Sequence, residues 1–427
     1  MYTGYRAVIR YVNLAFDCRP VHGRGGISHS GSFADLNDSQ STSGATEQPR
    51  WLALSGVIAA VSVFALAQGL SYPLFTFLMQ KQGLSAGYIG ASAAMTPFGL
   101  IFSAVFIPAL VRQLGARALA VGCALIASLC FLAVGYLQNE IAWFPLRFLI
   151  GVIINPLYVL GEVWMLALAP AERRGRIMGI FNAVTGIGYA LGPLSLALVG
   201  SDGWPPFLIG IFGFLGCAFL LAITAGNIRG LEDDGSPKTG IWSFWVVAPA
   251  LLLAVTVSAA TQQSVYSLLP VFGAGYGLPE ATLAVLITAM SLGNIFLQIP
   301  FGFAAEKFGA RPMIIACALG NMICAILLPL VILTPAVWPV LVVMGGVGYG
   351  VYTMALVELG NRFRGQALVA GNAAFALMWG VGGIAGPPGS GLVMEVIGAP
   401  GLPVVIASLS GILVLFALYR ALTRADP

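Results

Sequence analysis

The chain has 427 residues, of which 59% are hydrophobic and 8% are charged, with a formal net charge of +4. Soluble domains carry roughly a quarter of charged residues, so this composition excludes a soluble enzyme or a soluble nucleic-acid-binding protein. Both histidines, His22 and His29, precede the first apolar segment, which argues against a membrane enzyme with a Ser/His/Asp or zinc site. We therefore predict a membrane protein without catalytic residues, metal or cofactor.

Residues 1–50 differ from the rest of the chain. They contain five arginines and a stretch rich in Ser, Gly, Asp and Thr, with no apolar run long enough to span a membrane. This composition predicts a disordered cytoplasmic tail. The segment lacks the apolar core and the cleavage site of a signal peptide, and a start site assigned too far upstream is the alternative explanation.

Apolar runs of about 20 residues, the length that crosses a bilayer, recur from residue 52 to residue 422. They predict an all-α membrane protein with twelve transmembrane helices in two six-helix bundles, at 51–226 and 243–423. A linker at 227–242, rich in Gly, Pro and charged residues, divides the two bundles. The twelve spans are predicted near 52–79, 87–111, 118–137, 141–168, 177–200, 204–226, 243–270, 280–304, 312–333, 338–357, 366–393 and 402–422.

Basic residues in the loops predict the orientation, because Lys and Arg accumulate on the cytoplasmic side of a membrane. With the tail inside, thirteen basic residues fall inside and one, Lys81, falls outside. This asymmetry predicts a multi-pass protein of the cell inner membrane with both termini cytoplasmic. The thirteen are Arg112, Arg117, Arg173, Arg174, Arg176, Arg229, Lys238, Lys307, Arg311, Arg362, Arg364, Arg420 and Arg424.

An internal repeat relates the two halves at a constant offset of 194 residues. Several matched residues are ones that apolar helices would not share by chance, including Gln68 with Gln262, Tyr72 with Tyr266, and Tyr158 with Tyr352. Parallel repeats of this kind are related by an axis along the membrane normal and leave a site at their interface near the midplane. The repeat therefore predicts transport by alternating access, although shared ancestry alone would also produce it.

Polar residues mark one face of the fourth predicted helix. Arg147, Gly151, Asn155, Tyr158 and Glu162 follow one another at intervals of 4, 4, 3 and 4 residues, a spacing that aligns side chains on a helix. An Arg inside the membrane costs at least about 2.5 kcal/mol even on lenient insertion scales, so this face should meet a wet cavity or a partner. We predict that the face lines a substrate cavity, and an Arg147 that reaches the outer interface is the alternative.

The first and seventh helices carry similar polar rows. Gln68 with Tyr72, and Gln262 with Tyr266, lie four residues apart and share a helix face. Cavity lining and hydrogen bonding between helices explain these rows equally well. We include them, with Tyr352, among the candidate cavity residues.

Glu162 is predicted to act at the cytoplasmic end. It lies about 22 Å from Arg147 at 1.5 Å per residue, so the two do not pair directly, and Arg112, Arg117 or Arg176 is its expected partner. An ion pair of this kind would leave no evident proton carrier in the spans. We expect transport that depends only weakly on a proton gradient, with Arg147 orienting an anionic or hydrogen-bonding substrate.

The loop after the eighth helix resembles a signature of the major facilitator superfamily, roughly GxxxDRxGRR. In GFAAEKFGAR at 302–311, Glu306 takes the acidic position, Lys307 the basic one, Gly309 the tight turn and Arg311 the final base. The resemblance implies a gate of ion pairs that break when the cavity opens, whereas a cluster that only sets topology is the alternative. The first copy, PALVRQLGAR at 108–117, departs from the pattern because Arg112 stands where the acid belongs.

Glycines on the fifth helix also resemble a pattern of this superfamily. Gly179, Gly188, Gly192 and Pro193 match G-x8-G-x3-GP, which is often associated with exporters, and the second half repeats Gly382, Gly386 and Pro387. Small residues at this spacing allow close helix contact, so packing between the two halves explains them as well as any role in export.

Two stretches, at 161–184 and 358–388, are similar to the bacterial YcaD-like branch of the superfamily. The resemblance implies a monomeric exporter in the lipid bilayer that moves a small molecule, with or without a co-transported proton. The alternative is a membrane sensor or scaffold that keeps the fold without transport, which the missing acid at Arg112 favours.

Overall fold

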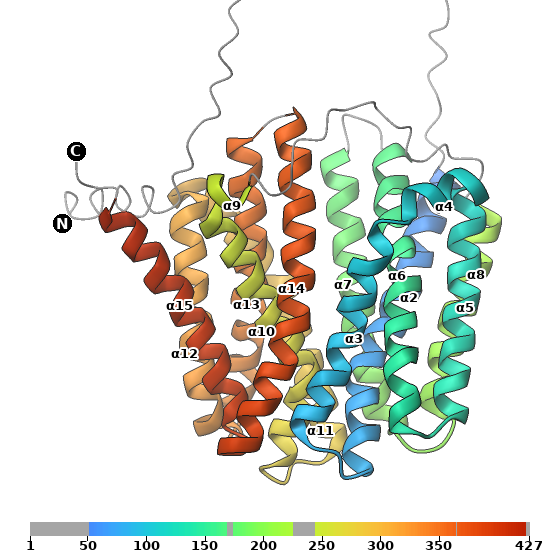
Figure 1. Ribbon diagram of the computed structural model, residues 1–427, viewed down its shortest axis with the longest axis horizontal. Coiled ribbons are helices and arrows are strands. Elements are labelled where there is room, and N and C mark those ends of the chain that lie inside the picture. The colour runs from blue at the N-terminus through green and yellow to red at the C-terminus, as the bar shows by residue number, and fades with distance from the viewer. Residues whose placement is uncertain (1–50, 169–173, 225–243, 364, 424–427) are drawn as a thin grey trace, which may run out of the picture.

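The computed structural model describes residues 51–168, 174–224, 244–363 and 365–423. The predicted tail at 1–50 and the predicted linker at 227–242 lie outside these residues. The described chain is helical throughout, with short turns between helices (Figure 1). The helices are α2 (Trp51–Lys81), α3 (Ala86–Ala104), α4 (Ile107–Leu114), α5 (Ala116–Tyr136), α6 (Glu140–Leu168), α7 (Arg174–Val199), α8 (Pro205–Thr224), α9 (Phe244–Val247), α10 (Pro249–Ala274), α11 (Glu280–Phe308), α12 (Ala310–Val331), α13 (Val337–Arg362), α14 (Gly365–Ile397) and α15 (Gly401–Thr423).

Each predicted span corresponds to one long helix, except the second, which is broken into α3 and α4, and the seventh, in which the short helix α9 precedes α10. Within the described residues nine helices are long and apolar enough to cross a membrane on their own, and α3 with α4 adds a tenth if the bent pair is one span. The two parts meet at 61°. Pro108 in the first turn of α4 explains the break, because proline lacks the backbone N–H and clashes with the carbonyl four residues earlier.

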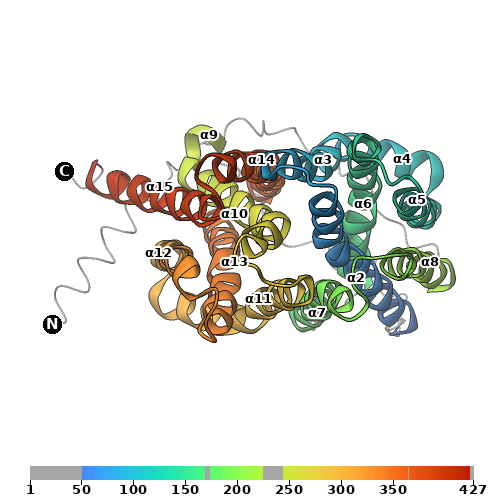
Figure 2. The same ribbon diagram turned by 90° about the horizontal axis from the view of Figure 1, so that it is seen from below.

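The helices alternate in direction, so their ends gather at two ends of the molecule. We call the end where α2 begins and α15 ends the terminal end, and the opposite one the distal end. α2 to α8 form one half and α9 to α15 the other (Figures 1 and 2). Between the halves, α3 packs along α14 and α7 packs along α11.

Repeat-related glycines make equivalent contacts in the two halves. A side chain at Gly99 would collide with the Phe148 carbonyl of α6, and one at Gly293 would collide with the Val342 carbonyl of α13. Both pairs differ by 194 residues. Each half therefore packs its second helix against its fourth in the same way, and the internal repeat found in the sequence is a repeat of structure.

The pseudo-symmetry axis passes between two repeat-related tyrosines. Tyr72 of α2 and Tyr266 of α10 face each other across the halves, with ring centroids 6.1 Å apart. The five cysteines of the described residues are free and buried: Cys123, Cys130, Cys217, Cys317 and Cys324.

Candidate functional site

Charged side chains join the two halves at the distal end. Lys81, at the end of α2, contacts Asp202 of its own half at 2.7 Å and Glu280, at the start of α11, at 3.2 Å. The Ser201 hydroxyl donates to the other Glu280 oxygen at 2.6 Å. Glu280 therefore bridges from the second half to two groups of the first.

A second pair of helices closes the distal end beside this bridge. The backbone N–H of Gly87, in the first turn of α3, donates to Glu395 of α14 at 3.0 Å. The glycines there admit no side chain, because a Cβ at Gly391 would collide with the Ala86 carbonyl and one at Gly90 with the Pro387 carbonyl. The halves are therefore in backbone contact at this end.

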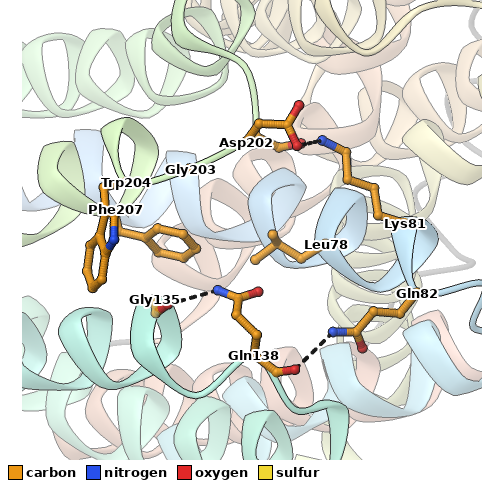
Figure 3. Close-up of a pocket in the computed structure, with 10 residues that line it drawn as sticks. Leu78, Lys81, Gln82, Gly135, Gln138, Asp202, Gly203, Trp204 and Phe207 are labelled. Carbon is orange, nitrogen blue, oxygen red and sulfur yellow. Dashed lines mark hydrogen bonds and ion pairs between the residues drawn. The ribbon is translucent and has the colours of Figure 1, made fainter.

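A cavity of about 380 Å³ opens next to the ion pairs (Figure 3). Its wall comes from the first half, at the distal ends of α2, α5 and α8. Gln138 donates to the Gly135 carbonyl, Gln82 donates to the Gln138 carbonyl, and Lys81 reaches Asp202 across the rim. Because this cavity lies within one half, it is not the interface site that the repeat predicts.

The same helix pairs separate toward the terminal end. On α14, Gly380 lies against Ile101 of α3, and nearer the terminal end of α14 both Asn372 and Ala376 are exposed.

The α7 and α11 pair separates in the same direction. Gly186 of α7 lies against Ile295 of α11. Beyond it, Asn182 of α7 and Ile299 of α11 are exposed. The two halves are thus open to the terminal end and closed at the distal end.

A row of polar groups lies at the interface between the halves, around Tyr72 and Tyr266. Gln68 donates to the Tyr72 hydroxyl at 3.4 Å, Tyr72 faces Tyr266, and the Tyr266 hydroxyl shares a 3.0 Å hydrogen bond with Ser291 of α11. Three of these residues were predicted as cavity residues. The amide oxygen of Gln68 is buried and has no hydrogen-bond partner.

A second set of residues combines aromatic rings with one carboxylate, and we call it the aromatic wall. It consists of Tyr158 and Glu162 of α6, Tyr349 and Tyr352 of α13, and Trp379 of α14. Glu162 accepts a hydrogen bond from Tyr158 and lies within electrostatic range of both tyrosines of α13. The Trp379 ring packs against Tyr352 at 4.8 Å and against Tyr349 at 6.0 Å between centroids. The aromatic wall therefore contains residues of both halves.

The sequence-based expectation for Glu162 differs from what the structure shows. Glu162 forms no ion pair with any described residue, and neither Arg112 nor Arg117 reaches it. Arg117 donates instead to the Ala222 carbonyl. The side chain of Arg176 lies outside the described residues. Glu162 is one turn beyond Tyr158 on α6, and it lies within electrostatic range of Tyr349 and Tyr352 of α13.

Arg147 lies inside the first half rather than on the aromatic wall. It is 1% exposed, its guanidinium carbon lies 4.7 Å from the centre of the Phe75 ring, and it donates to Ser92 of α3 at 3.4 Å. No carboxylate among the described residues is within ion-pair distance, and its Nε has no hydrogen-bond partner. Arg147 thus ties α6 to α2 and α3 in this state, and it does not touch the opening.

Two further predicted cavity residues lie against helices of their own halves. The Asn155 amide donates to the Leu100 carbonyl at 2.9 Å and to Ser103 at 3.0 Å, because a partly buried amide needs partners and α3 offers them. Gln262 is buried near Gly348 of α13. Asn155 therefore ties α6 to α3 in this state, and its place on the cavity wall stays a prediction.

The loop signature of the second half is anchored by a residue that the sequence reasoning missed. Arg311 contacts Glu358 of α13 at 2.6 Å, and Glu358 also pairs with Arg362, one turn later on the same helix. All three lie in the second half. Glu358 and Arg362 are four residues apart, a spacing that favours an ion pair on a helix and that could have identified Glu358 from the sequence.

The other residues of the two loop signatures are exposed at the terminal end. Glu306 and Lys307 form no ion pair within the described chain, and Lys307 lies over the neighbouring Phe308 ring. Arg112 is exposed as well. Gly309 makes the tight turn that was predicted, with φ of 91°, a conformation that favours glycine.

The glycines of the fifth and eleventh helices are packing residues, as predicted, but their partners belong to the same half. Side chains at Gly188 and Gly192 would collide with the backbone of α2, and side chains at Gly382 and Gly386 with the backbone of α10. Packing of these four between the halves was therefore a wrong interpretation.

The remaining packing candidates on these two helices differ in what they contact. Pro193 lies inside α7 and Pro387 inside α14. The Pro387 carbonyl meets α3 of the other half at Gly90. Gly179 lies on α7, and its surroundings are outside the described residues.

Comparison with known sequences identifies one family profile and several relatives. The profile of the Major Facilitator Superfamily matches residues 57–357 and 251–427. The chain is 24% identical to the uncharacterized MFS-type transporter YfkF of Bacillus subtilis, over 79% of this chain and 88% of the relative. It is 24% identical to the uncharacterized MFS-type transporter YcaD of Escherichia coli K12, over 88% and 96%.

Comparison with solved structures shows the same fold. A point mutant of the nucleoside transporter NupG aligns with a TM-score of 0.70 at 14% identity, over 88% of this chain and 100% of NupG. A bacterial homologue of the human lysosomal transporter Spinster, in an inward-facing and occupied conformation, aligns with a TM-score of 0.70 at 13% identity, over 88% and 97%.

Proposed function

We propose that this chain, which belongs to the Major Facilitator Superfamily, carries a small organic molecule across the membrane by alternating access. Membership in this family supports a multi-pass membrane transporter rather than an enzyme. The substrate, the direction and the mechanism are our proposal. The two halves are the rocking units, and the aromatic wall with the polar row above it is the substrate path.

One observation carries this proposal, namely that the same helix pairs touch at one end and separate at the other. Backbone contact at Gly391 and Gly90 gives way to exposed Asn372 and Ala376 along the same interface. A fixed scaffold has no need of an interface that is half open. Two halves that rock about Tyr72 and Tyr266 require one.

The basic loops support an assignment of the terminal end to the cytoplasm, with both termini inside. In that orientation the described state is open to the cytoplasm, which is the state that loads a substrate for export. Export is the direction we propose, supported also by the exporter-like glycine pattern from Gly179 to Pro193.

Spin labels at the two ends test the proposal without knowledge of the substrate. One pair, Gln82→Cys with Ala281→Cys, reports the distance between the halves at the distal end. A second pair, Gln113→Cys with Asn361→Cys, reports it at the terminal end. All four positions are exposed.

We expect two distance populations at each end in reconstituted membranes, with short distal distances accompanying long terminal ones. Conditions that lengthen the distal distance should shorten the terminal distance. One unchanging population at both ends, including in a variant whose distal contact has been disrupted, would instead support the non-transporting scaffold.

A further inference from the structure

Glu162 is a membrane-embedded carboxylate without a cationic partner among the described residues. It lies in the interior of α6, six residues before the helix ends, and its described neighbours are tyrosines. Intramembrane carboxylates are rare, and they almost always pair or mark the path of an ion or substrate. Among the described residues no basic side chain is within ion-pair distance of Glu162, so we ask what its surroundings would attract from outside the protein.

The groups around Glu162 restrict the chemistry of that partner. Tyr349, Tyr352 and Trp379 present aromatic rings from the opposite half, with centroids 4.8 to 6.0 Å apart. Ring faces carry negative electrostatic potential and attract cations, most strongly at Trp and Tyr. A carboxylate and ring faces together therefore attract positive charge and repel an anion.

The wall is accessible to a ligand. The Tyr158 side chain is 40% exposed, although it lies in a helix at the centre of the molecule. Glu162, Tyr352 and Trp379 are partly exposed as well. α6 and α13 are not a closely packed helix pair in the described structure, and they belong to different halves.

Three arginines of the described residues are held elsewhere and do not pair with Glu162. Arg147 is separated from it by about 22 Å along α6 and is enclosed by Phe75 and Ser92. Arg311 and Arg362 are held by Glu358 within the second half. The expectation of an anionic substrate oriented by Arg147 is therefore not supported by where Arg147 lies.

We propose that the substrate is an organic cation, a protonated amine or a quaternary ammonium or phosphonium compound, bound between Glu162 and the aromatic rings of Tyr349, Tyr352 and Trp379. This inference rests on the proposed transport function and specifies its substrate class. The carboxylate comes from the first half and the rings from the second, so a bound cation contacts both rocking units.

Equilibrium dialysis of the purified full-length protein with radiolabelled tetraphenylphosphonium tests the charge preference. Tetraphenylborate has nearly the same size and shape with the opposite charge, and triphenylphosphine oxide is a neutral comparison. Tetramethylammonium and tetraethylammonium, used as competitors, cover smaller cations. We expect the cations to bind and the anion and the neutral compound not to bind.

Variants then locate the binding. Glu162→Gln should weaken cation binding by about tenfold or more, since it removes the charge at constant size. Glu162→Asp keeps the charge and should retain most of the affinity. Trp379→Leu should weaken binding by about threefold to tenfold. Glu140→Gln, at the distal start of the same helix, is the matched control and should bind as the unmodified chain does.

Two results would overturn the cation assignment: binding of none of these cations above the level of tetraphenylborate, or equal binding by Glu162→Gln. Neither result bears on the proposed function, because the spin-label distances report the exchange of the halves separately. Cation binding that depends on Glu162 in a protein with fixed distances would contradict transport and leave a cation-binding membrane protein.

Discussion

The distal and terminal ends use charged residues in opposite ways. At the distal end Glu280 of one half contacts Lys81 and Ser201 of the other, and Glu395 contacts the backbone of α3. At the terminal end Glu358 holds Arg311 and Arg362, and all three belong to one half. The distal charges span the interface, whereas the paired terminal charges do not.

This difference separates two properties that a transporter must control. A contact between halves exists in one state and is lost in the other, so it changes the balance between states. A contact within a half is kept in both states, so it changes the stability of the half and cancels from the balance. Substitutions at individual residues can show whether a given contact belongs to the first class or the second.

The largest effect is expected at Glu358. Its side chain is 8% exposed, and Glu358→Gln would leave Arg311, itself 15% exposed, facing a neutral group. Removal of one partner from a buried ion pair costs about 3–5 kcal/mol. We expect a marked loss of thermal stability of the purified protein, with unchanged spin-label distances in the fraction that remains folded.

The repeat provides the control for Glu358. Its counterpart in the first half is Trp164, which is buried, and Arg117 there donates to a backbone carbonyl. Arg117→Gln should therefore destabilise the protein much less than Arg311→Gln. A change in the balance of states by Glu358→Gln would mean that the terminal pair also acts between halves.

The next effect concerns backbone contact at the distal end. Gly391→Ala places a Cβ against the Ala86 carbonyl, whereas Gly389→Ala, two residues earlier on α14, meets open space. Overpacking costs about 1–3 kcal/mol, a factor of about 5 to 150 in a two-state balance. Gly391→Ala should lengthen the distal spin-label distance and shorten the terminal one, and Gly389→Ala should leave both unchanged.

The distal ion pairs should have a smaller effect on the balance between the two states, and the sign of this effect depends on which partner is removed. Glu280→Gln breaks the pair between halves and should favour the open distal end. Asp202→Asn breaks the pair within the first half, which leaves Lys81 to Glu280 and should favour the closed end. These side chains are more than a third exposed, so solvent screening limits each effect to less than about 1 kcal/mol.

The dependence on ionic strength tests whether the two variants act through charge. Because exposed ion pairs weaken as ionic strength rises, the difference between Glu280→Gln and Asp202→Asn should fall between 0.01 and 1 M salt, values chosen to change the Debye length from about 30 to about 3 Å. The spin-label populations measure it. A difference that salt does not change would point to the Ser201 hydrogen bond instead.

The long apolar helices, the two halves and the glycine contacts could be predicted from the sequence because each leaves a local or periodic signal. Apolar length identifies a span, and a fixed offset identifies a repeat. The bend between α3 and α4 could also have been predicted, because Pro108 lies in the first turn of α4.

The site was predicted less completely, for physical reasons. Helical spacing places Arg147, Asn155 and Glu162 on one face, but the face is wide enough to meet three different neighbours. Asn155 reaches α3, Arg147 reaches α2 and α3, and Glu162 faces α13. Which neighbour each one meets depends on tertiary packing. Glu358 was missed because its repeat counterpart is a Trp, so the repeat gave no signal there.

The smallest effect concerns the charges that face no partner in this state. α7 is the partner of α11 in the other half, and its sequence begins with Arg174 and Arg176. We expect closure of the terminal end to bring Glu306 and Lys307 closer to this positive charge, which attracts Glu306 and repels Lys307. Glu306→Gln should therefore reduce the population with a closed terminal end, and Lys307→Gln should increase it, each by about twofold, since exposed pairs contribute about 0.2–1 kcal/mol. The control is Arg112→Gln, because the 61° bend carries α4 away from α14 (Figure 2), and we expect no shift in the terminal spin-label distance. Shifts of the same sign in Glu306→Gln and Lys307→Gln would show that the loop acts through its backbone and not through its charges.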